Sequence, residues 1–250
     1  MDLGIRGKVA LVTGSGQGLG RAAALALAAE GVNVCISDVN EENGLKVMEE
    51  AKALGVKAIF FKADVSDPEQ IKALFAAILE QLGPVEILVN NAGISPKTAT
   101  FDKLTPEEFT KVLSVNVLGA YLCAQQAFVH MKEQGWGRII NLSSIGGIYG
   151  SNVSGVHYTS SKGALISMTK SLSRNMGPFN ITVNAVAPGR ILTPMALAAP
   201  PEVNEGIRQR IALRRLGTPE DVANVIAFLA SEPGGYVTGD CVNIDGGYIS

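Results

Sequence analysis

The chain has few of the residues that build disulfide scaffolds or metal clusters. Its three cysteines, Cys35, Cys123 and Cys241, lie far apart and form no Cys-x-x-Cys motif, which argues against a disulfide framework and fits a reducing compartment. Its two histidines, His130 and His157, are too few and too widely separated for a cluster of metal ligands. We therefore expect a cytoplasmic protein without a metal site.

Charge and long apolar runs are scarce as well. Charged residues make up 18% of the 250 residues and the formal net charge is −2, without a dense Lys/Arg stripe, which argues against nucleic-acid binding. The apolar runs are of strand length or are broken by polar residues, so no membrane span is expected. The N-terminus lacks the charged-then-apolar order of a signal peptide. A hydrophobic content of 47% indicates instead a compact, well-buried globule.

A glycine-rich turn stands between the first expected strand and the first expected helix. Residues 8–13 form a short apolar run, an alanine-rich helix is expected over 21–30, and residues 33–38 predict a second buried strand; the glycines lie between at 14, 16, 18 and 20. Together these segments predict a βαβ unit. Glycines let the backbone approach a pyrophosphate, and the helix N-terminus supplies N–H donors, so we expect a dinucleotide site here.

The residue that closes the second strand predicts which dinucleotide is bound. A carboxylate at the position of Asp38 accepts hydrogen bonds from the adenosine ribose hydroxyls and repels a 2′-phosphate. Neither Gln17 in the loop nor Val39 and Asn40 after the strand supplies a cation for that phosphate. The sequence therefore predicts NAD(H) rather than NADP(H). Asp38 could in addition cap the helix that starts near Glu41.

The rest of the chain continues the alternation of strands and helices. Helix starts are marked by Pro68, by the capping box at 105–108 and by the Thr-Pro pair at 218–219. No linker, charge run or repeat interrupts the pattern, so we expect one domain of the α/β class with a parallel, doubly wound, seven-stranded sheet. The further strands are expected at 58–63, 86–89, 138–141, 181–187 and 241–244, and residues 145–156 form a glycine-rich loop.

Polar residues occur where ligands of such sheets bind. Asn90-Asn91-Ala92-Gly93 follows the fourth strand and should face the cofactor. Asn116 lies inside an apolar helical run, where a buried amide needs partners; a structural network and a role at the site are equally good explanations. Residues 190–201 are rich in alanine, proline and leucine, and with the helical stretch to about 212 they predict a small substrate lid.

Tyr158 and Lys162 lie four residues apart, which places them one turn apart on one helix face. A free tyrosine has a pKa of about 10, too high for a general acid or base at neutral pH. A nearby ammonium favours the phenolate, so we expect Lys162 to lower the pKa of Tyr158 into the working range. A serine from the pair Ser143-Ser144 could hold a substrate oxygen beside them.

Taken together, these segments resemble the short-chain dehydrogenase/reductase family over essentially the whole chain. The resemblance implies a Rossmann-type fold and an oxidoreductase acting on CH–OH groups with a nicotinamide dinucleotide. The matching motifs are the cofactor loop with Gly14, Ser15, Gln17, Gly18 and Leu19, the adenine-contacting pair Asp64-Val65, the strand-four motif with Asn91, Ala92 and Gly93, the nicotinamide-side segment with Pro188, Gly189, Ile191 and Thr193, and the catalytic tetrad Asn116, Ser144, Tyr158 and Lys162.

The resemblance also implies the role of each tetrad residue. Ser144 polarises the substrate oxygen, Tyr158 gives or takes the proton, Lys162 lowers the pKa of Tyr158, and Asn116 holds a water in the proton path. Tyr158 and Lys162 are also expected to bind the cofactor, Lys162 at the nicotinamide ribose. Ser144 and Tyr158 lie fourteen residues apart, one more than is usual in the family, which leaves Ser143 as the alternative to Ser144. A homotetramer is implied too, with the helices of Asn116 and Tyr158 at one interface.

The substrate is less closely specified by the resemblance. Many relatives are 3-oxoacyl-[acyl-carrier-protein] reductases, which typically use NADPH and meet the acidic carrier through arginines near the active-site rim. The aligned positions here hold Gly135 and Phe179, and Asp38 disfavours NADPH. We therefore expect a small or medium hydrophobic alcohol or ketone, with 3-oxoacyl-carrier reduction as the alternative. A dinucleotide-binding sensor without catalysis is a minor alternative, disfavoured because all four tetrad residues are present.

Overall fold

The computed structural model describes residues 2–96, 101–151, 154–197 and 201–248. It contains a seven-stranded parallel sheet in the order β3-β2-β1-β4-β5-β6-β7. The predicted doubly wound α/β sheet is therefore confirmed. The strands are β1 (Val9–Thr13), β2 (Asn33–Asp38), β3 (Ala58–Lys62), β4 (Ile87–Asn90), β5 (Gly137–Leu142), β6 (Ile181–Pro188) and β7 (Cys241–Ile244).

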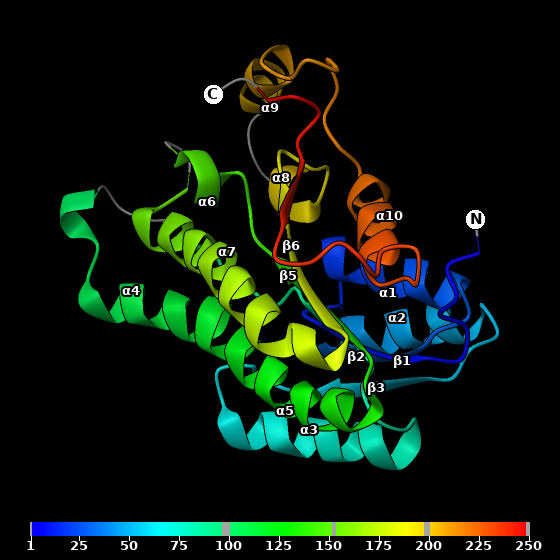
Figure 1. Ribbon diagram of the computed structural model, residues 1–250. Coiled ribbons are helices and arrows are strands. Elements are labelled where there is room, and N and C mark those ends of the chain that lie inside the picture. The colour runs from blue at the N-terminus through cyan, green and yellow to red at the C-terminus, as the bar shows by residue number, and fades with distance from the viewer. Residues whose placement is uncertain (1, 97–100, 152–153, 198–200, 249–250) are drawn as a thin grey trace.

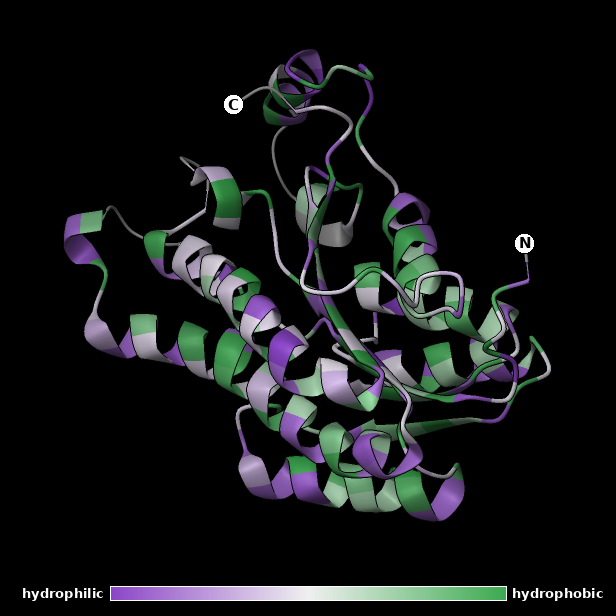
Figure 2. Ribbon diagram, viewed as in Figure 1, coloured by the Kyte–Doolittle hydropathy of each residue, from purple (hydrophilic) through white to green (hydrophobic). Residues whose placement is uncertain are grey.

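Helices cover both faces of this sheet (Figure 1). The central strands β1, β4, β5 and β6 are buried throughout, as expected when both faces are covered. In Figure 2 these strands and the facing turns of α1 and α10 are mostly hydrophobic, whereas α9 is mostly hydrophilic. The α-helices are α1 (Gly18–Ala29), α2 (Glu41–Lys52), α3 (Pro68–Gln81), α4 (Pro106–Leu113), α5 (Gly119–Gln134), α6 (Gly146–Tyr149), α7 (Val156–Met176), α8 (Pro194–Leu197), α9 (Pro201–Gln209) and α10 (Pro219–Leu229).

The core has two halves, one on each face of the sheet. On one face α1, α2 and α10 bury a cluster that includes Leu27, Val47 and Ile226. On the other face α3 and α5 bury a second cluster that includes Leu74 and Met131. The chain leaves β1 for β2 on one side and reaches β4 on the other, so the strand order reverses between β1 and β4. Ligands of such sheets bind at the carboxyl ends of the strands at this switch point.

Helices α4 and α5 are joined without a break by a π-helical turn (Ser114–Leu118). The combined helix Pro106–Gln134 is long and apolar enough to cross a membrane by length and composition alone, a test that core helices also pass. Its residues Cys123, Ala124 and Met131 are buried in the core, and α5 packs on α3, β4 and β5. One face of this helix therefore packs on the core of the protein.

Several local details differ from the sequence-based expectation. Residues 146–149, expected within a loop, form the short helix α6. Helix α2 is capped by Asn40, whose side chain accepts from the Asn43 N–H, so the cap suggested for Asp38 is wrong. The carboxylate of Asp38 accepts from the N–H of Asn40 instead, at 2.9 Å. The chain turn that follows β2 thus leaves Asp38 facing the glycine loop rather than the helix.

Candidate active site

The loop between β1 and α1 is shaped to hold an anion. Gly18, the first residue of α1, has φ +57°, a left-handed conformation that suits glycine, and a Cβ there would lie 3.8 Å from Thr193 Cγ2 and 3.9 Å from Thr193 Cβ. The N-cap residue Gln17 makes no capping bond from its side chain to any described residue, and the first turn carries no acidic side chain. The N–H groups of this helix start are therefore open to a phosphate, as the dinucleotide prediction requires.

The loop is fixed from behind by buried hydrogen bonds. Ser15 is fully buried and its hydroxyl donates to the Val12 carbonyl at 2.7 Å, while its N–H donates to the Ser37 carbonyl. Asn91 donates to the carbonyls of Thr13 and Gly14 at 2.9 and 2.8 Å. The predicted cofactor residues of the first and fourth strand ends thus form one connected unit, which Ala92 joins by donating its N–H to Thr13 Oγ1 at 3.1 Å.

Asp38 lies against this loop at the end of β2. One oxygen of its half-buried carboxylate accepts from the Gly16 N–H at 2.8 Å. The cation paired with this position in the sheet register is Lys62, which forms an ion pair with Glu41 at 3.6 Å. The carboxylate is thus held against the glycine loop.

The predicted adenine-contacting pair follows β3 at the same edge of the sheet. Asp64 is exposed, and one carboxylate oxygen accepts from the N–H and the hydroxyl of Ser66, at 2.9 and 2.7 Å. Val65 is buried and packs against Gly119. A Cβ added to Gly119 would come within 2.7 Å of the Val65 Cγ2. The pair therefore consists of one exposed polar residue and one packing residue.

Ser144, not Ser143, faces Tyr158. The Ser143 hydroxyl is buried and donates to the Lys162 carbonyl at 2.8 Å, which joins the end of β5 to α7. Ser144 makes a side-chain hydrogen bond with Tyr158 and accepts from the Gly146 N–H at 3.1 Å. Helix α6 supplies that N–H. The hydroxyls of Ser144 and Tyr158 are therefore close together at the carboxyl end of β5.

Lys162 lies below the tyrosine and is buried. Its Nζ is 5.7 Å from the centre of the Tyr158 ring and donates to the Leu142 carbonyl at 2.5 Å. Burial lowers the pKa of Lys162 to about 8. Burial raises the pKa of Tyr158, and the hydrogen bond with Ser144 opposes that rise only in part. The expected lowering of the Tyr158 pKa by Lys162 is therefore wrong, because desolvation of the phenolate raises this pKa and Ser144 is the group that opposes the rise.

Asn116 lies in the π-helical turn and is buried. Its amide oxygen accepts from the Ile94 N–H at 2.8 Å, and its amide nitrogen donates to the Ile94 carbonyl and to the Ser161 hydroxyl at 3.1 and 2.9 Å. A Cβ on Gly93 would lie 3.2 Å from the Asn116 oxygen and 3.4 Å from Lys162 Nζ. The side chain thus fixes the segment after β4, and this network stands directly beside Lys162.

A cavity of about 490 Å³ opens above these residues. Its described lining is mixed: the polar residues include Ser95, Ser144, Tyr158, Arg190 and Arg210, and the apolar ones include Ile145, Ala196 and Ile207. The cavity therefore has both polar and apolar walls. The predicted cofactor residues that also line it are Leu19, Pro188, Gly189, Ile191 and Thr193.

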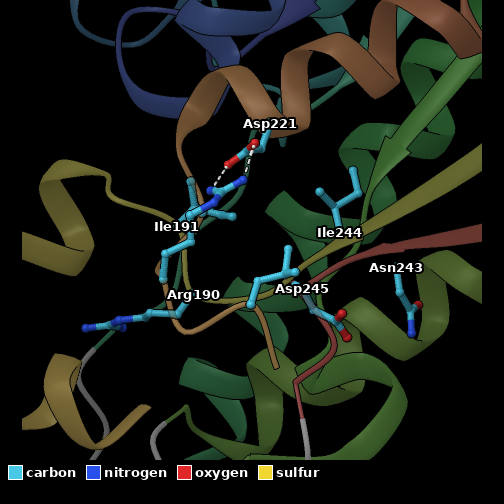
Figure 3. Close-up of a pocket in the computed structure, with 10 residues that line it drawn as sticks. Arg190, Ile191, Asp221, Asn243, Ile244 and Asp245 are labelled. Atoms are coloured by element: carbon cyan, nitrogen blue, oxygen red, sulfur yellow. Dashed lines mark hydrogen bonds and ion pairs between the residues drawn. The ribbon is translucent and has the colours of Figure 1, made fainter. Parts of the chain in front are cut away.

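A second cavity of about 270 Å³ lies at the carboxyl ends of β6 and β7. Arg190, Ile191, Asp221 and Asp245 are among its lining residues (Figure 3). Arg215 forms a bidentate ion pair with the carboxylate of Asp221, with N···O distances of 2.6 and 2.9 Å. This ion pair holds the pKa of the Asp221 carboxyl well below its usual range. In Figure 3 the Arg190 guanidinium points away from Asp221 and Asp245.

The two positions aligned with carrier-binding arginines do not lie near the cavity. Gly135 ends α5 just before β5, and Phe179 lies just before β6, so both are at the amino ends of the strands. The side chain of Asn180 joins them by donating to the Gly135 carbonyl at 2.9 Å. The cavity lies at the opposite, carboxyl ends. The expectation that these positions mark the active-site rim of the same chain is wrong. The absence of arginine at Gly135 and Phe179 is therefore not evidence against an acyl-carrier substrate.

Known proteins resemble the chain along its whole length. A family model described as enoyl-(acyl carrier protein) reductase matches residues 14–249. The 3-oxoacyl-[acyl-carrier-protein] reductase FabG of Aquifex aeolicus is 41% identical over 99% of each chain, and that of Thermotoga maritima is 40% identical over 98% of this chain and 99% of its own. A solved 7α-hydroxysteroid dehydrogenase, complexed with NADH and 7-oxo glycochenodeoxycholic acid, is 31% identical with a TM-score of 0.94, covering 99% of this chain and 96% of its own.

Proposed function

Because the chain belongs to the short-chain dehydrogenase/reductase family, we propose that it reduces the 3-oxo group of an acyl thioester, or oxidises the matching alcohol, with a nicotinamide dinucleotide. The observation that carries the proposal is the joining of Ser144, Tyr158 and Lys162 at the carboxyl end of β5, beside the glycine loop. The thioester is favoured over a small hydrophobic ketone by the names of the relatives.

The chemistry follows from the contacts of these three residues. The bound dinucleotide supplies or accepts the hydride. The Ser144 hydroxyl lies beside the Tyr158 hydroxyl, so both can donate to the same carbonyl oxygen and polarise it. The raised pKa keeps Tyr158 protonated at neutral pH, which suits it to give its proton to a ketone. The ammonium of Lys162 stabilises the phenolate that remains, and Asn116 holds the neighbouring segment in place.

For the cofactor we propose NAD(H). The support is the Asp38 carboxylate, fixed at 2.8 Å from the Gly16 N–H next to the phosphate-binding loop. Two unit charges about 5 Å apart repel by roughly 3 kcal/mol at an effective dielectric constant of about 20, so a 2′-phosphate there is strongly disfavoured. The wild-type protein should bind NADH at least about tenfold more tightly than NADPH in fluorescence titrations, and Asp38→Ser should narrow that ratio. A wild-type preference for NADPH would contradict the assignment.

A secondary alcohol or ketone outside the thioester class is the second candidate. It is favoured by Asp38, because NAD(H) is the expected cofactor of such dehydrogenases. Both candidates are tested by NADH and NADPH oxidation with 3-oxoacyl thioesters, simple ketones and diketones. Turnover of thioesters above simple ketones supports the first, and the reverse order supports the second. Cofactor binding without turnover of any compound would support the non-catalytic sensor.

We propose further that the active form is a cytoplasmic homotetramer in which residues 190–212, of which 198–200 lie outside the described residues, act as a substrate lid. The long helix of α4 and α5 exposes Leu118, Tyr121 and Val129, each more than two-fifths accessible, on the side away from the sheet. An exposed apolar stripe of this kind is typical of a subunit interface. Light scattering of the purified protein at several concentrations tests the assembly. A monomer at every concentration would refute it.

A further inference from the structure

Two arginines line the cavity above Tyr158, and no acidic residue is found among its described lining residues. Arg210, at the end of the lid, makes no side-chain hydrogen bond or ion pair with any residue that the structure describes. Arg190 comes from the end of β6 and donates to Asn204 Oδ1 and to the Ala196 carbonyl, at 2.9 and 3.2 Å, which are neutral partners. The cavity wall therefore carries positive charge that the described part of the protein does not neutralise.

The neighbouring arginines of the same segment are neutralised. Arg208 makes two hydrogen bonds to the carboxylate of Glu205, at 2.7 and 2.6 Å. Arg215 is paired in the same way with Asp221. Neither Arg208 nor Arg215 lines the larger cavity. Arg208 and Arg210 both belong to the same end of the lid. Arg208 is paired with a carboxylate and does not line the cavity, whereas Arg210 lines the cavity and has no carboxylate partner among the described residues.

The Arg210 side chain is nevertheless held in place. Its guanidinium carbon lies 5.2 Å from the centre of the Tyr248 ring, a cation–π contact. Tyr248 is brought there by the C-terminal segment, which pairs with the lid through the Ile211–Tyr248 bridge and through the Ala212 N–H, which donates to the Gly247 carbonyl at 3.1 Å. Gly247 has φ +75°, and a Cβ on it would come within 2.9 Å of the Ala212 Cβ, so this pairing requires glycine.

We propose that Arg210, together with Arg190 in the lining of the same cavity, forms a subsite for an anionic group on the substrate, a carboxylate or a phosphate, at the end remote from the carbon that exchanges hydride. The inference rests on the proposed function, since it assigns one end of the substrate to Tyr158 and the other to Arg210. A guanidinium presents a planar fork of donors that matches the oxygens of both anions. In the acyl thioester the phosphate of the pantetheine arm would supply the anion; in a small oxo acid the carboxylate would.

Matched substrate pairs test the subsite. A 3-oxoacyl phosphopantetheine is compared with the same 3-oxoacyl pantetheine, and an oxo acid with its methyl ester, for the wild type, Arg210→Gln and the control Arg208→Gln. The wild type should prefer the anionic member of one pair about tenfold or more in kcat/KM, mainly through KM. Arg210→Gln should lose this preference and keep its rate on the neutral member, and Arg208→Gln should retain it. Which pair shows the effect identifies the anion.

Binding without turnover separates this inference from the proposed function. Calorimetric titration of Tyr158→Phe with each pair, in the presence of NADH, measures affinity alone. Anion preference that disappears on adding Arg210→Gln supports the subsite even where the wild type turns over none of these compounds, in which case only the proposed function fails. If the enzyme turns over these compounds and Arg210→Gln does not change the ratio of kcat/KM between the anionic and the neutral member, the subsite is refuted and the proposed function is retained. Equal binding of anionic and neutral members by both proteins also overturns it.

Discussion

Replacing the buried Lys162 by methionine should abolish activity and change how stability depends on pH. Burial lowers the pKa of this ammonium from an ordinary 10.5 to about 8 in the folded protein. The shift corresponds to roughly 3 kcal/mol of unfolding free energy lost at neutral pH. Methionine keeps the length of the side chain and removes that cost, but it also removes the bond to the Leu142 carbonyl, which is worth about 1–3 kcal/mol.

The sign of the pH effect follows from proton binding in the two states. The unfolded chain holds the Lys162 proton up to about pH 10.5, whereas the folded protein releases it near pH 8. Between these values the unfolded state binds more protons, so the wild type gains stability as pH rises. Below about pH 8 the free-energy cost of burying the charged Lys162 is fully present, and above about pH 10.5 it is absent. The stability advantage of Lys162→Met over the wild type should therefore shrink by up to roughly 3 kcal/mol from pH 7 to 10.5.

Urea unfolding in half-unit pH steps, at one fixed protein concentration, measures this difference. Other groups titrate in the same range, but they are common to both proteins and cancel in the comparison. Lys46→Met, a substitution of an exposed lysine, is the matched control and should show a difference that does not vary with pH. A difference between Lys162→Met and the wild type that stays constant across the range would refute the reasoning.

Three other predictions concern catalysis and packing. Ketone reduction should decline as pH rises through about 8, because Lys162 loses its charge there; a kcat/KM profile that is flat to pH 10 would contradict this. Gly44→Ala should cost about 1–3 kcal/mol in thermal unfolding, since its Cβ would come within 2.0 Å of the Phe60 ring, whereas Gly206→Ala, with nothing within 4 Å, should cost nothing. Asn116→Ala breaks three hydrogen bonds and should reduce both stability and turnover, and unchanged turnover would leave Asn116 a purely structural role.

Local patterns were enough to predict the order of strands and helices. The glycines at 14–20, the acidic end of β2 and the capping box at 105–108 each act over a few residues, and the structure places all three as expected. The close approach of Ser144, Tyr158 and Lys162 was also foreseeable, because a serine at the end of β5 and the start of the next helix meet at one sheet edge.

Properties that depend on long-range packing were not foreseeable. The pKa of Tyr158 depends on how much of the ring is desolvated, which spacing along a helix cannot give. The direction of Arg190 and Arg210 depends on the lid and on the C-terminal segment, which are joined by backbone bonds between residues far apart in the chain. The locations of Gly135 and Phe179 could have been foreseen, since both precede strands and so fall at the amino edge of the sheet.

The most direct test of the account is the rate of NADH oxidation by a 3-oxoacyl thioester for the wild type and for Tyr158→Phe, with NADH binding followed in parallel by fluorescence. We expect turnover by the wild type and a loss of about 100-fold to 10,000-fold in kcat for Tyr158→Phe, because only the proton donor is removed. Binding of NADH should be unchanged within about twofold, since the glycine loop and Asp38 are untouched. Turnover by Tyr158→Phe close to the wild-type rate would contradict the central claim.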